Sequence, residues 1–139
     1  MKKLMVQIII AFFAVFGTLA PSCPHQKSPE YYFATGKREY GEKDYKDAYK
    51  YLSRAIKLNP DYLEAIWLRA NLEMETDSFA SAIKDFSRVI ELKKSGDAFY
   101  LRANARWEIA DSLGACKDWQ TACDLNNNRS CDLIRKNCK

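Results

Sequence analysis

Histidine is almost absent from this sequence, and the usual catalytic motifs are missing. The single histidine, His25, lies in a short polar stretch where we expect a solvated linker residue. The chain has no glycine-rich phosphate loop, no nucleophile elbow and no pair of carboxylates at a spacing suited to acid–base catalysis. We therefore expect no enzyme activity, no catalytic residue and no cofactor.

The chain also lacks a strong excess of charge. Its formal net charge is +4, and this includes Lys2 and Lys3 of an N-terminal segment that we expect to be removed. The remaining Lys and Arg residues nearly balance the 18 Asp and Glu residues. A balanced surface gives no electrostatic basis for binding nucleic acid or an anionic membrane. A hydrophobic fraction of 47% and a charged fraction of 29% are typical of a globular domain, and the length suits one such domain.

The only long hydrophobic run stands at the N-terminus. Two lysines after Met1 precede the run LMVQIIIAFFAVFGTLA, and small residues follow it. This order predicts a secretory signal peptide over residues 1–22. An uncleaved membrane anchor is the alternative, but the uninterrupted hydrophobic part is shorter than the about 20 residues that a spanning helix needs.

The end of this segment resembles a bacterial lipobox, in which a small residue precedes a cysteine that becomes lipidated. Ala20 and Pro21 depart from the usual pattern, and Cys23 would be the lipidated residue. Residues 23–29 would then form a short tether. We expect an exported protein held at the bacterial cell envelope by an N-terminal lipid anchor, with a soluble periplasmic or secreted protein as the alternative.

The rest of the chain repeats itself with a period of 33–34 residues. The letters Leu-Arg-Ala-Asn begin at Leu68 and again at Leu101, and Asp85-Phe86 recurs as Asp118-Trp119. Small residues recur at equivalent positions, and the first repeat ends in Asn-Pro. This pattern resembles the tetratricopeptide repeat, which implies an all-α solenoid of antiparallel helix pairs. We expect a domain over 30–139, with repeats at about 29–62, 63–95 and 96–128 and a capping helix over 129–138.

Two charged pairs recur with the period. Arg69 and Arg102 are equivalent, and Asp85 and Asp118 each follow 16 residues later. The first repeat lacks both charges at the matching positions. Joint presence and joint absence predict an ion pair between the two helices of a repeat. The alternative, that the arginines hold an acidic ligand, is the weaker interpretation.

Four cysteines follow a helical spacing at the C-terminus. Cys116 and Cys123 lie two turns apart, as do Cys131 and Cys138, and a turn containing Asn127 separates the two pairs. An antiparallel hairpin about this turn, with Ser130 as the helix cap, would join Cys116 to Cys138 and Cys123 to Cys131. Four reduced, buried cysteines are the alternative. A metal site is not expected, because no C-x-x-C spacing occurs.

The resemblance also implies a concave groove lined by the first helix of each repeat. Aromatic side chains and asparagines suit contact with an extended peptide or a partner helix. Some of these aromatics could instead pack only between helices, Tyr40 and Trp107 above all. The positions lack the Lys/Asn/Arg set by which some relatives hold a C-terminal carboxylate. The nine predicted groove residues are Phe33, Lys37, Tyr40, Trp67, Asn71, Met74, Tyr100, Asn104 and Trp107.

These observations favour a scaffold that binds another envelope protein or a peptide, and no nucleic acid. A permanent structural subunit of a larger envelope complex is one alternative. A redox protein that uses the C-terminal cysteines is another.

Overall fold

The computed structural model describes residues 27–138, so the expected signal peptide, Cys23 and His25 lie outside the described residues. The described part contains helices and no strand. None of these helices combines the length and the hydrophobicity that crossing a membrane requires. The helices are α2 (Pro29–Gly41), α3 (Tyr45–Leu58), α4 (Leu63–Glu75), α5 (Phe79–Leu92), α6 (Gly96–Glu108), α7 (Ser112–Asp124) and α8 (Asn128–Asn137).

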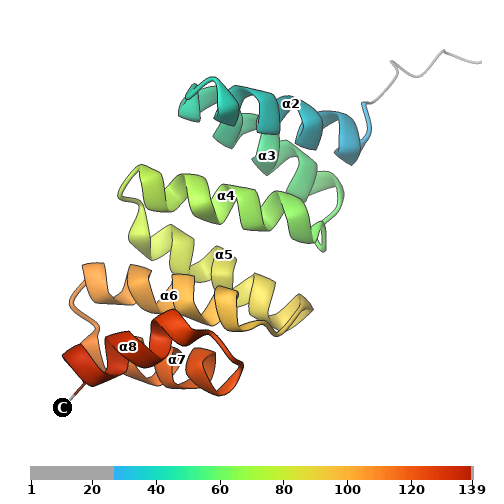
Figure 1. Cartoon of the computed structure of the whole chain (residues 1–139). Coiled ribbons are helices and arrows are strands. Elements are labelled where there is room, and N and C mark those ends of the chain that lie inside the picture. Colours follow the sequence, from blue (N-terminus) through green and yellow to red (C-terminus); the bar gives the residue numbers. More distant parts are fainter. Residues whose placement is uncertain (1–26, 139) are drawn as a thin grey trace, which may run out of the picture.

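The helices stack in chain order, each antiparallel to its neighbours, and α8 folds back against α7 (Figure 1). Three helix pairs, α2–α3, α4–α5 and α6–α7, correspond to the three repeats, and α8 follows them. The all-α helix-pair solenoid expected from the period is therefore confirmed.

Polar residues begin most of the helices by satisfying a free backbone N–H group. The Ser28 hydroxyl accepts a hydrogen bond from Tyr31 N, and Pro29 follows at the first helical position. Asp44, Ser95, Asp111 and Asn127 accept equivalent bonds at later helix starts. These caps fix the first residue of every described helix except α4 and α5.

Small residues let the helices of a pair approach closely. Ala48, Ala82 and Ala115 occupy equivalent positions, and all three are fully buried. Gly36 is packed so tightly that an added Cβ would lie 2.9 Å from Leu52 Cγ. Each pair thus buries its own hydrophobic residues, and neighbouring pairs share further clusters along the stack.

The arginines of repeats two and three bind across the stack. Arg69 donates to both carboxylate oxygens of Asp85 at 2.6 and 2.8 Å, and Arg102 contacts Asp118 at 2.8 Å twice. Each arginine also donates to a serine of the preceding repeat. Arg69 Nη1 lies 3.1 Å from Ser53 Oγ, and Arg102 Nη1 lies 2.9 Å from Ser87 Oγ. These side chains therefore join three helices, not two.

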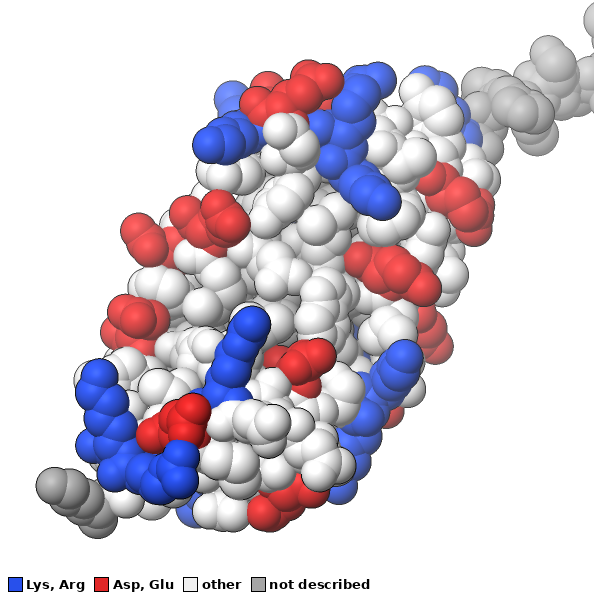
Figure 2. All heavy atoms as spheres, in the orientation of Figure 1, with Lys and Arg blue, Asp and Glu red and all other residues white. Residues whose placement is uncertain are grey.

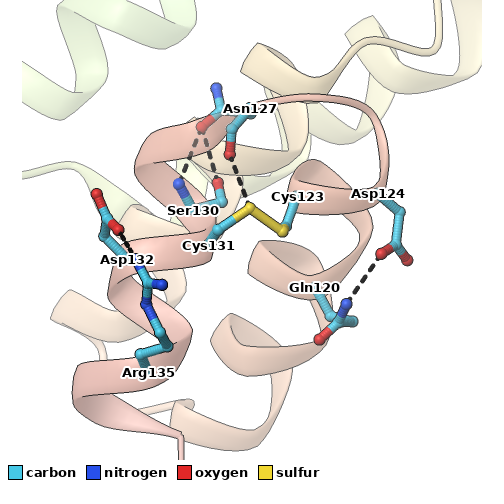
Figure 3. The surroundings of a disulfide bond; sticks show 8 residues. All are labelled: Gln120, Cys123, Asp124, Asn127, Ser130, Cys131, Asp132 and Arg135. Carbon is cyan, nitrogen blue, oxygen red and sulfur yellow. Dashed lines mark hydrogen bonds and ion pairs between the residues drawn. A yellow bond between two sulfur atoms is a disulfide. The ribbon is translucent and has the colours of Figure 1, made fainter.

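Two disulfides close the C-terminal hairpin. The outer disulfide joins Cys116 to Cys138. The inner disulfide, drawn in Figure 3, joins Cys123 to Cys131 across the turn between α7 and α8. The expectation that Ser130 caps α8 is wrong. Asn127 is the cap, because its Oδ1 accepts bonds from both the backbone and the hydroxyl of Ser130, which is fully buried.

Candidate partner-binding groove

Two cavities of about 500 Å³ each lie along the side of the stack formed by the first helices of the repeats. They share Trp67 and Asp97, so they form two parts of one groove. The first cavity is lined by Phe33, Lys37, Leu63, Glu64, Trp67, Leu68, Val89, Lys93, Ser95 and Asp97. The second is lined by Trp67, Asp97, Tyr100, Leu101 and the loop residues 126–129.

Four of the nine predicted groove residues line these cavities. Phe33, Trp67 and Tyr100 hold the same position in successive repeats, and Lys37 lies one turn after Phe33. Other aromatic rings pack against Phe33 and Trp67 inside the fold. The centroid of Phe33 lies 5.1 Å from that of Tyr62. These side chains present a row of partly exposed rings held in place by the core.

The two predicted asparagines are engaged inside the molecule. Asn71 Nδ2 donates to the carbonyl of Trp67 at 2.9 Å, one turn earlier in α4. Asn104 Oδ1 accepts a hydrogen bond from Trp119 Nε1 at 3.0 Å. Neither residue lines either groove cavity. The bond of Asn71 fixes its side chain against its own helix, and the bond of Asn104 holds the Trp119 ring in position.

The last residue of each predicted row also packs against a neighbouring helix. The Tyr40 hydroxyl donates a hydrogen bond to the Glu75 carboxylate. The pKa of Tyr40 is raised, mainly by burial and secondly by the negative charge of Glu75, so the hydroxyl stays protonated. Met74 contacts the hydrophobic cluster around Phe86. The ring of Trp107 lies tilted against that of Trp119, with centroids 5.4 Å apart, although Trp107 remains 38% exposed. The interpretation of these aromatics as interhelical packing therefore agrees with the contacts of Tyr40, and in part with those of Trp107.

The turn before α8 forms a wall of the groove that the repeat pattern did not predict. Residues 126–129 face Trp67 and Tyr100 across the second cavity, and Asn127 Nδ2 donates to Asp97 Oδ1 at 2.8 Å. Gly96 brings the two segments together, because an added Cβ would lie 3.1 Å from the carbonyl oxygen of Leu125. The only signal in the sequence was the run of three asparagines, which indicated a turn but not its contacts.

The charges around the groove are mixed. In Figure 2 a largely uncharged strip runs along the middle of the visible face, with most of the acidic side chains along its edges and many basic side chains near its ends. Within the cavities, Lys37 and Lys93 lie near Glu64 and Asp97. Such a surface suits a ligand with a hydrophobic centre and charges of both signs. Among residues 27–138, no group of three or more metal-ligating side chains lies together.

Known proteins share the sequence pattern and the fold of the repeated unit. A family model described as "Tetratricopeptide repeat" matches residues 39–105. The N-terminal domain of stress-induced protein-1 from C. elegans superposes with a TM-score of 0.73 at 17% identity, covering 80% of this chain and 94% of that one. The helix pairs therefore resemble tetratricopeptide repeats in sequence over residues 39–105 and in fold along the stack.

A second solved structure has a similar helical fold. The first tetratricopeptide domain of Spaghetti (RPAP3), bound to the HSP90 peptide SRMEEVD, has a TM-score of 0.70 at 21% identity, covering 78% of this chain and 89% of that one. A UDP-N-acetylglucosamine–peptide N-acetylglucosaminyltransferase from Giardia intestinalis is 40% identical over 67 residues, which cover 46% of this chain. The chain spans 4% of that enzyme's length, so this match concerns the tetratricopeptide repeats alone.

Proposed function

We propose that this protein is an adaptor of the bacterial cell envelope that binds a peptide segment or helix of another envelope protein in its groove. The observation that carries the proposal is the pair of adjoining cavities whose shared wall is Trp67. Aromatic rings that are held by the core lose little entropy on binding, so they make effective contacts with a partner. Tetratricopeptide domains are scaffolds for protein–protein interaction, which agrees with this assignment.

The ligand should combine hydrophobic side chains with a lysine or arginine and an acidic residue. Hydrophobic side chains would contact the rings of Phe33, Trp67 and Tyr100, while Glu64 and Lys37 provide opposite charges within the first cavity. The short acidic peptide bound to the Spaghetti domain is not the ligand that we expect here. In this chain the acidic Asp97 lines both cavities, and its carboxylate would repel such a peptide.

Site-specific photo-crosslinking in cells would test the groove. A photoreactive phenylalanine analogue replaces Trp67 or, separately, Tyr100, and a matched control carries it at the exposed Gln120 of α7. We expect both groove positions to form the same covalent adduct with one envelope protein, whereas Gln120 does not. No adduct at the groove positions, or the same adducts at all three positions, would overturn the proposal.

Once the partner is identified, affinity and size separate an adaptor from a permanent subunit. Trp67→Ala should weaken binding by at least about tenfold if the ring is a central contact. Gel filtration of native extract should then show a population of the protein at its own size. A protein found only within a large complex would instead be a permanent structural subunit.

Intact mass tests the proposed anchor and the bridges together. Protein from native membranes should begin at Cys23, carry acyl groups and gain four protons on reduction. Each buried methylene of an acyl chain contributes about 0.8 kcal/mol to membrane binding. A chain without lipid that begins elsewhere would refute the anchor and favour a soluble exported protein. Bridges that cycle under mild reductant while the fold survives would favour the redox alternative.

A further inference from the structure

A third cavity lies outside the groove, between the start of α3, the end of α4 and the start of α5. Its volume is about 440 Å³. Hydroxyl groups, two tyrosine rings, one carboxyl group, one lysine and one leucine line it, so its chemistry differs from that of the groove. The lining residues are Tyr45, Lys46, Tyr49, Leu72, Glu73, Thr76, Ser78 and Ser81.

Glu73 is the unusual residue of this cavity. Its exposed fraction is only 3%, and its Oε2 has no hydrogen-bond partner among the described residues. Buried carboxylates in folded proteins normally have a donor or a cation beside them, because an unpartnered one is costly. The nearest arginine, Arg69, directs its hydrogen bonds to Asp85 and Ser53 instead.

The third repeat shows what the equivalent place can hold. The residue 33 positions after Glu73 is Arg106, a cation in place of an acid. Arg106 Nη1 lies 3.1 Å from Asp118 Oδ2 and 3.3 Å from the carbonyl oxygen of Gly114, and Arg106 Nε lies 3.7 Å from Asp111 Oδ2. A guanidinium group therefore occupies this junction in repeat three.

The second repeat has polar groups at the positions that surround Arg106 in repeat three, but it has no cation at the position of Arg106 itself. Asp85 stands where repeat three has Asp118, while Ser78 and Ser81 stand where it has Asp111 and Gly114. Ser78 and Ser81 line the cavity beside Glu73. In repeat three the guanidinium of Arg106 fills this place. In repeat two the equivalent place is a cavity, and the buried carboxyl group of Glu73 lines it.

We propose that this cavity receives the guanidinium group of an arginine side chain from a partner protein, with Glu73 as its carboxylate acceptor. The hydroxyls of Ser78 and Ser81 supply further acceptors, and the half-exposed ring of Tyr49, over which the Arg69 guanidinium lies at 5.7 Å, forms part of the wall. A guanidinium fits better than an ammonium because its several donors match acceptors spread around the cavity. The site lies apart from the groove and does not depend on its use.

Binding at this site should depend on pH. Burial, and then the neighbouring Asp85 carboxylate, raises the pKa of Glu73 from its ordinary value near 4.5 to about 7, while Arg69 and Lys84 act in the opposite direction. The groups that face Glu73 from α3 are Tyr45, Lys46 and Tyr49. Since a guanidinium binds the ionised carboxylate, affinity should increase as the pH rises through 7.

The test is an NMR titration of the purified protein with N-acetyl-arginine-amide, followed through the backbone amides of Ser78 and Ser81. We expect saturable shifts at pH 8, with half-saturation at roughly millimolar concentration, as is usual for a ligand of this size. At pH 5.5 binding should be about 30-fold weaker, because little Glu73 is ionised there. N-acetyl-lysine-amide should bind more weakly than the arginine probe.

Matched variants decide whether Glu73 is the acceptor. Glu73→Gln, or Glu73→Met as a second variant, should abolish the saturable shifts while the rest of the spectrum stays unchanged. Glu108→Gln, which removes an exposed carboxylate that lines neither the groove nor this cavity, should leave them intact. The proposal fails if the shifts survive in both Glu73 variants or if the wild-type protein shows none. Equal or tighter binding of the lysine probe would overturn the assignment to guanidinium.

Discussion

Replacing Glu73 by glutamine should stabilise the free protein progressively as the pH rises from 4.5 to 8. The folded protein holds this carboxyl group at a pKa of about 7, against about 4.5 when it is exposed to solvent. Between these values the folded state binds more protons than the unfolded state. The free energy of unfolding of the wild-type protein therefore falls as the pH rises through this window.

The magnitude follows from the size of the pKa difference. Each unit is equivalent to about 1.4 kcal/mol, so a difference of about 2.5 units changes the free energy of unfolding by about 3 kcal/mol. This is a large share of the about 5–15 kcal/mol that stabilises an ordinary domain. The charges around Glu73 are Arg69 on α4, Lys84 and Asp85 on α5, and Lys46 on α3.

The assay is urea unfolding of the wild-type protein and the glutamine variant in steps from pH 4 to pH 8.5, followed by circular dichroism. The variant's advantage in free energy of unfolding should grow by about 3 kcal/mol between pH 4.5 and pH 8. Glu64→Gln is the control, and we expect no comparable change. If the advantage of the Glu73 variant stays constant with pH, or reverses at pH 8, the reasoning is refuted, because Glu73 must then have a stabilising partner.

Further substitutions test the packing of the stack. Arg69→Met should cost about 3–5 kcal/mol in chemical denaturation, because it strands the buried carboxylate of its partner. Arg102→Met should cost less, since a second arginine still contacts the carboxylate in repeat three; the reverse order would contradict this. Gly36→Ala should lower stability by about 1–3 kcal/mol because its Cβ would meet Leu52, whereas Gly41→Ala, which has open space, should be neutral or slightly stabilising in thermal melts. Replacing both cysteines of the outer disulfide by serine should cost about 3 kcal/mol, as the loop of 22 residues implies; no loss would show that the bridge is not structural.

The helices could be predicted because their signals are local or strictly periodic. The repetition of Leu68–Asn71 at Leu101–Asn104 placed two first helices at once. The constant spacing from Arg69 to Asp85 and from Arg102 to Asp118 pointed to the contacts that the structure contains. Helical spacing also predicted the pairing of the cysteines. The two cysteines of each helix lie two turns apart, so an antiparallel helical hairpin brings Cys123 to Cys131 and Cys116 to Cys138.

The groove was harder to predict, because its open residues depend on helices that are distant in sequence. Asn104 has the right position for ligand contact, but Trp119 engages it from α7. Met74 is likewise covered by α5. The sequence shows that Glu73 and Arg106 hold equivalent positions in their repeats. Only the structure shows that Glu73 Oε2 has no hydrogen-bond partner among the described residues, whereas Arg106 contacts the carboxylate of Asp118. A repeat pattern therefore predicts the position of a side chain better than its availability.

The arginines that join three helices also imply a gradient along the stack. Repeats two and three each carry such an arginine, and repeat three is further closed by two disulfides. Repeat one has Thr35 at the matching position, and its hydroxyl bonds only to the preceding turn of its own helix. The helices beneath the C-terminal half of the groove are therefore tied to one another by more hydrogen bonds and covalent links than the helices of repeat one.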